Sequence, residues 1–90
     1  MKKTVYTDAT VTALGEAYDK ANEAYTAARH AYHRMNDALA KWSNANDTHE
    51  RNAPFYEEAQ QLNALLDATY YAMSAARSAL NRAELETGRA

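Results

Sequence analysis

Apolar residues recur at alternating steps of three and four along the first half of the chain. They are Val11, Leu14, Tyr18, Ala21, Tyr25, Ala28, Tyr32, Met35, Leu39 and Trp42. This is the spacing of heptad positions a and d, which share one face of an α-helix. Either Thr7 or Asp8 is suited to cap the first turn. The pattern therefore predicts a helix over about residues 8–44.

The second half of the chain repeats the same spacing. Its apolar-face positions are Phe55, Ala59, Leu62, Leu66, Thr69, Met73, Ala76, Leu80 and Ala83. Pro54 stands where proline is favoured, at the first helical position, and Gly88 supplies a stop. We therefore expect a second helix over about residues 54–87.

The connection between the two helices, residues 45–53, is polar throughout. Within it, Asp47 and Glu50 have the spacing of a capping box, which predicts a single helical turn. Long helices joined by a short connection fold back antiparallel. The sequence predicts one all-α domain over residues 1–90, a long antiparallel two-helix hairpin of coiled-coil type, about 45–50 Å long at 1.5 Å per residue.

The pairing of the two helices follows from matching bulky core residues with small ones. The predicted register places Trp42 opposite Ala59 and Tyr25 opposite Ala76, so that large and small side chains alternate across the core. A register one heptad away places Trp42 opposite Asn52, which packs less well. In the predicted register the three tyrosines that repeat every seven residues are the large half of the core.

A second stripe of small apolar residues runs beside these core positions, and we call it the alanine strip. It comprises Ala17, Ala24, Ala31, Leu65, Ala68, Ala72, Ala75 and Ala79. Alanine is the best helix former, so the strip is open to a simple interpretation as solvated helix surface. The flank on the other side of the core is polar, however, which favours one-sided docking. We expect two hairpins to associate through this strip into a homodimer that forms a four-helix bundle, or one hairpin to bind another protein through it.

One aromatic residue lies away from both stripes. Tyr71 falls opposite the core positions, where it has no packing role within the hairpin. Exposed tyrosines often anchor protein interfaces, although a single one can also be incidental. We add Tyr71 to the predicted partner-binding residues.

The composition and net charge argue against several classes of function. Ninety residues bury little core alone, and without cysteine no disulfide supplements it. A net charge of −2 gives no reason to expect binding to nucleic acid or to an anionic membrane. Apolar runs are too short for a membrane span, and polar residues interrupt the start, MKKTVYTDATVTAL, where a signal peptide needs an apolar core. We expect a cytoplasmic protein.

No set of residues has the spacing that a catalytic or metal site requires. His30 and His33 fall on the outer face of the first helix, whereas a zinc or di-iron site needs converging ligands. The serines lack a histidine within helical reach, and no glycine-rich loop is present to hold a phosphate or an oxyanion. The sequence predicts no catalytic residue, no metal and no cofactor, so the protein is not expected to be an enzyme.

Trp42, near the predicted turn, supports a resemblance to one known family. The chain resembles the secreted WXG100 proteins in size, in its two-helix layout and in having a tryptophan near the turn. The corresponding segment reads Trp42-Ser43-Asn44, without the glycine of that family's motif, and its connection is longer. The resemblance implies a structural or secreted assembly hairpin.

The residues themselves favour a small non-enzymatic module that occupies the surface of a partner protein. Its most concrete form is an inhibitor or accessory protein of the phage or mobile-element type, such as an anti-defence or anti-CRISPR-like protein. The alternative is the WXG100-like assembly hairpin. The sequence leaves open which protein is the partner, and whether the strip serves self-association.

Overall fold

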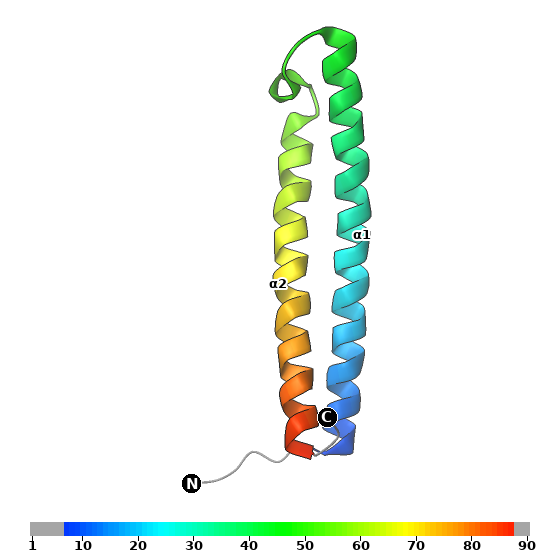
Figure 1. Ribbon diagram of the computed structural model, residues 1–90, viewed down its shortest axis with the longest axis vertical. Helices are drawn as coiled ribbons and strands as arrows, with labels where there is room; N and C mark the ends of the chain where they lie inside the picture. Colours follow the sequence, from blue (N-terminus) through cyan, green and yellow to red (C-terminus); the bar gives the residue numbers. More distant parts are fainter. Residues whose placement is uncertain (1–6, 88–90) are drawn as a thin grey trace.

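The computed structural model describes residues 7–87 and consists of two long helices that lie side by side (Figure 1). Helix α1 spans Asp8–Asn46, a 3-10 turn η1 spans Glu50–Asn52, and helix α2 spans Tyr56–Thr87. This confirms the predicted all-α antiparallel hairpin. With 39 residues in α1, the rod is about 58 Å long at 1.5 Å per residue, longer than predicted because α1 extends past the start of α2.

Helix α1 begins and ends with side-chain and backbone caps. Thr7 is the N-cap, and its Oγ1 accepts a hydrogen bond from the backbone N–H of Thr10 at 3.1 Å. At the other end Asp47 adopts the left-handed conformation with φ of 50°, and its N–H donates to the carbonyl of Ser43. This cap lets α1 continue to Asn46, two residues beyond the predicted end.

Helix α2 begins two residues later than predicted. Pro54 and Phe55 form a turn, which is closed by a hydrogen bond from the N–H of Tyr56 to the carbonyl of Ala53 at 3.0 Å. Proline therefore precedes the helix and does not occupy its first position. The predicted stop at Gly88 lies outside the described residues.

The helical turn predicted in the connection is present, but its cap is a different residue. Asp47 ends α1, and His49 caps η1 by accepting a hydrogen bond on Nδ1 from the N–H of Arg51 at 3.0 Å. The capping-box spacing located the turn correctly and assigned the wrong cap, because the left-handed backbone at Asp47 places this residue in the α1 terminus.

All the predicted a and d positions are buried or half-buried. The most complete burial is at Ala83, which has no exposed surface. Leu39, Ala53 and Ala59 form a buried cluster near the connection, and partly buried apolar side chains pack against it: Met35, Trp42, Phe55 and Tyr56. The heptad pattern thus identified the core face of both helices.

The register of the two helices differs from the predicted one. The rings of Tyr25 and Tyr70 are in contact, with centroids 5.7 Å apart. The prediction placed Tyr25 opposite Ala76, which lies six residues or about 9 Å further along α2. The predicted register is wrong, and the contacts fit the alternative about one heptad away.

The connection explains this shift. It turns back beside the last turns of α1, beyond the start of α2 (Figure 1), and the Ser43 hydroxyl donates to the Thr48 carbonyl to hold it there. Ala53 belongs to the buried cluster that contains Leu39, and Phe55 packs against this cluster. Together they cover the part of α1 around Leu39 that the predicted register had placed against α2.

Candidate protein-interaction surface

The tyrosines that repeat every seven residues in α1 face a matching repeat in α2. The pairs are Tyr18 with Arg77, Tyr25 with Tyr70, and Tyr32 with Asn63. Residues 63, 70 and 77 share heptad position e, beside the core positions. The residue types along this flank predicted a polar surface, but the half-buried rings of Tyr18, Tyr25 and Tyr32 lie along it. The seven-residue spacing at position e was visible in the sequence and was the signal that could have revealed it.

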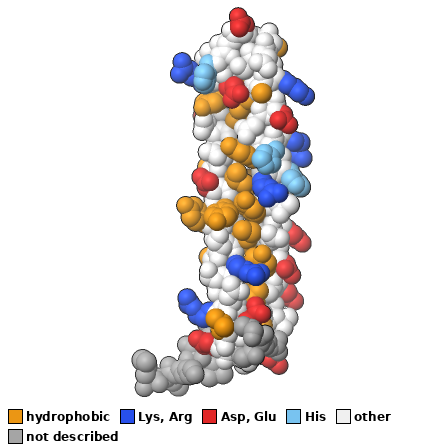
Figure 2. Space-filling view, in the orientation of Figure 1, with side chains coloured by type: hydrophobic (Ala, Val, Ile, Leu, Met, Phe, Trp, Pro, Cys, Tyr) orange, Lys and Arg blue, Asp and Glu red, His pale blue; other side chains and the backbone are white. Residues whose placement is uncertain are grey.

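Three rings on this flank form a connected group, which we call the aromatic cluster: Tyr25, Tyr70 and Tyr71. Tyr70 meets Tyr25 edge to face at 5.7 Å and meets Tyr71 edge to face at 6.0 Å. Both α2 tyrosines are accessible, Tyr70 being 49% and Tyr71 71% exposed. In Figure 2 hydrophobic side chains form a column between the helices that is widest at mid-height. Tyr71 is therefore exposed as expected, and its ring contacts Tyr70, a neighbour that was not predicted from the sequence.

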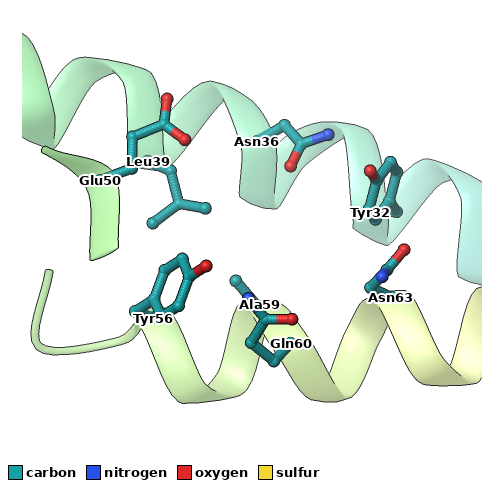
Figure 3. Close-up of a pocket in the computed structure, with 8 residues that line it drawn as sticks. All are labelled: Tyr32, Asn36, Leu39, Glu50, Tyr56, Ala59, Gln60 and Asn63. Carbon is teal, nitrogen blue, oxygen red and sulfur yellow. The ribbon is translucent and has the colours of Figure 1, made fainter. Parts of the chain in front are cut away.

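A polar pocket lies between α1, η1 and the start of α2 (Figure 3). It has a volume of about 180 Å³, and Leu39 and Ala59 form its apolar part. Its polar lining consists of Tyr32, Asn36, Glu50, Tyr56, Gln60 and Asn63. Ligand pockets for drug-sized molecules are usually larger than about 300 Å³, so this pocket matches a single side chain better than a cofactor.

The polar groups of this pocket are available to a ligand. Within residues 7–87, the side chains of Asn36, Glu50, Gln60 and Asn63 form no hydrogen bond with one another or with the rest of the chain. They are not sealed from water, because Asn36, Gln60 and Asn63 are exposed and Glu50 is half-buried. Figure 3 shows Asn63 directed toward Tyr32, and the hydroxyl of Tyr56 directed into the space between the helices.

The alanine strip is largely at the surface. Its exposed members are Ala17, Ala24, Leu65, Ala68, Ala72 and Ala75, whereas Ala31 and Ala79 are half-buried. Leu65, the largest apolar side chain of the strip, is 49% exposed. Because Tyr25 meets Tyr70, Ala24 of α1 lies about level with Ala72 of α2. The observed register thus aligns the two halves of the strip.

Other side chains considered from the sequence do not converge. His30 and His33 are exposed on the outer face of α1, as expected. Across the described part of the chain, no three His, Cys, Asp or Glu side chains are placed to hold a metal ion together. Neither α1 nor α2 combines the length and the apolar composition that a membrane crossing requires.

Comparison with known proteins adds no relative. No family model matches the chain, and no curated protein or solved structure is significantly similar to it. The resemblance to WXG100 proteins therefore rests on layout alone, with a half-buried Trp42 that packs against the cluster around Leu39.

Proposed function

We propose that the protein is a non-enzymatic helical module that acts by binding another protein and occupying part of its surface. The observation that supports this is the aromatic cluster, in which Tyr70 and Tyr71 are exposed and yet held by ring contacts. Tyrosine is enriched among the residues that dominate binding energy at interfaces. A ring already confined by its neighbours loses less conformational freedom on binding than a free one.

The most concrete form of the proposal is a cytoplasmic inhibitor or accessory protein of the phage or mobile-element type, of the kind that blocks a host defence system. Support comes from the small size and the rod shape. Two long helices present one continuous flank, on which the polar pocket, the aromatic cluster and the Tyr18–Arg77 pair follow one another. A binder of this kind covers a partner's working surface without chemistry of its own. Self-association through the alanine strip is a separate part of the proposal and has its own test below.

Affinity capture with matched variants tests the proposal. The full chain, the double variant Tyr70→Ser/Tyr71→Ser and the control Leu85→Ser are each immobilised and exposed to a lysate of the native host. Leu85 is 68% exposed on the same helix but outside the aromatic cluster. We expect one protein to be retained by wild type and by the control, and to bind the double variant at least about thirtyfold more weakly, the effect of losing a 2 kcal/mol hot spot.

Circular dichroism must show the same helicity for all three proteins, since both tyrosines are largely outside the core. Equal retention of every captured protein by wild type and the double variant would remove the aromatic cluster as the binding surface and, with it, the support for this function.

A further inference from the structure

We propose that the polar pocket binds the guanidinium group of an arginine side chain on the partner protein. This inference rests on the proposed function and specifies the chemistry by which the same flank of the hairpin recognises its partner. It is carried by the size of the pocket, the charge of its lining and a contact that occurs elsewhere in this same chain.

The charge of the lining excludes most other occupants. Glu50 is the one formally charged residue among those that line the pocket, and it is half-buried. An anion placed there faces a carboxylate with no cation to offset it. An apolar group makes no hydrogen bond to the exposed amides of Asn36, Gln60 and Asn63 and so gains nothing from them. A cation that carries several donors satisfies both the carboxylate and the amide oxygens.

The arrangement of acceptors favours arginine over lysine. Asn36 lies on α1, Gln60 and Asn63 lie on α2, and Glu50 of η1 lines the end nearest the connection, with its carboxylate drawn beside α1 (Figure 3). A guanidinium group presents five donors in a rigid plane and can reach acceptors on both walls, whereas an ammonium group has three donors at one point. A volume of about 180 Å³ suits one such side chain.

The chain contains an example of a guanidinium group packed against one of the repeating tyrosines of α1. The guanidinium of Arg77 lies over the ring of Tyr18, 5.3 Å from the centroid, a cation–π contact. Tyr32 is two heptads along α1 from Tyr18, and its counterpart on α2 is Asn63, two heptads from Arg77. At this level the tyrosine is retained and a short amide stands in place of the arginine, and both Tyr32 and Asn63 line the pocket. An arginine from a partner fills the equivalent position.

Nuclear magnetic resonance titration with short capped peptides tests the inference. The probe is acetyl-Gly-Arg-Gly-amide, and citrulline in place of arginine gives a neutral control of the same shape. We expect the arginine peptide to shift the side-chain amide signals of Asn36, Gln60 and Asn63. The citrulline peptide should bind about tenfold more weakly, because a charge-assisted hydrogen bond to Glu50 is lost.

Two variants with the same change in charge localise the effect. Glu50→Gln should weaken the arginine peptide about tenfold, whereas Glu57→Gln, an exposed residue in the first turn of α2, should leave its affinity unchanged. Both variants keep the size of the side chain, and circular dichroism checks that both remain helical. A lysine peptide that binds as tightly as the arginine peptide would overturn the preference for a guanidinium group.

The inference fails if the arginine peptide shifts no signal of the pocket, or if Glu50→Gln and Glu57→Gln bind it equally. That failure is distinct from failure of the proposed function, which depends on Tyr70 and Tyr71. Loss of partner capture in the tyrosine variant together with an unresponsive pocket would keep the binding module and discard the arginine site.

Discussion

A tyrosine at a core position of a two-helix hairpin behaves differently from a leucine. Tyr18, Tyr25 and Tyr32 are half-buried, whereas Leu39, which continues the same seven-residue repeat, is only 4% exposed. The difference arises because a tyrosine ring gains from burial while its hydroxyl needs water or another polar partner. The three rings therefore lean to the flank of the core, where they contribute to packing and to the surface together.

The backbone conformation of Asp47, the residue that ends α1, can be tested by substitution. Asp47 is the one residue of the described chain other than glycine with positive φ, and it places a negative charge at a helix C-terminus, where the dipole disfavours it. Asp47→Gly should raise the free energy of unfolding by about 0.5–1 kcal/mol, since glycine adopts this conformation without a steric cost.

Urea denaturation followed by circular dichroism measures this change. Asn44→Gly, three residues earlier and within α1, is the matched control and should lower stability by a few tenths of a kcal/mol. A loss of stability in Asp47→Gly would mean that the aspartate side chain has a stabilising role that its backbone geometry does not reveal.

At the scale of the element, heptad spacing was sufficient to find both helices and the face that each one buries. Their ends were predicted to within two residues, with errors at Asn46 and at Tyr56. These errors have a local cause, because a left-handed Asp47 and a turn at Pro54 are decided by backbone conformations that several residue types can adopt. Hydrophobic periodicity carries no information about these backbone conformations.

Helix α1 contains a glycine that its packing does not require. Adding a Cβ atom at Gly15 meets nothing within 4 Å. Gly15→Ala should therefore raise the free energy of unfolding by about 0.5–1 kcal/mol through higher helix propensity.

The comparison for this substitution is Ala40→Gly, at an exposed position of the same helix, which should lower stability by about the same amount. Thermal melts of both variants beside wild type measure the two effects. A destabilised Gly15→Ala protein would indicate that the space around Gly15 is occupied in solution, for example by a second chain.

At the scale of the whole molecule, the sequence was not sufficient to determine the register. Two pairings one heptad apart keep nearly every apolar position facing the other helix, so the heptad pattern does not distinguish them. The rule of pairing large with small residues favoured the wrong one, because it ignored the freedom of tyrosine to turn outward. The contribution of Ala53 and Phe55 could not be weighed before the path of the connection was known. The aromatic cluster and the polar pocket depend on the register, and they were missed for the same reason.

The alanine strip is the apolar surface through which we expect two hairpins to associate. Its two halves are aligned and mostly exposed, and Leu65 adds the largest apolar side chain among them. We expect a homodimer in which small residues allow the two hairpins to approach closely. Ala72→Glu should dissociate it by burying an unpaired charge, while helicity is retained.

Light scattering at several concentrations distinguishes the two states. Wild type and the control Ala40→Glu, which changes an exposed position, should have the mass of a dimer, and Ala72→Glu should have the monomer mass of 10.0 kDa. Wild-type protein that remains monomeric at every concentration would contradict the role given to the strip.

Both helices start and finish so that Asp8 and Thr87 lie at one tip of the rod, opposite the connection (Figure 1). A label, a surface or a carrier protein attached beyond either residue is therefore joined to the same tip. The pocket, which Tyr32, Leu39 and Tyr56 line, then lies in the half of the rod away from the point of attachment. Tethering through either end therefore leaves the half of the rod that carries the pocket clear of the attachment, and the connection farthest from it.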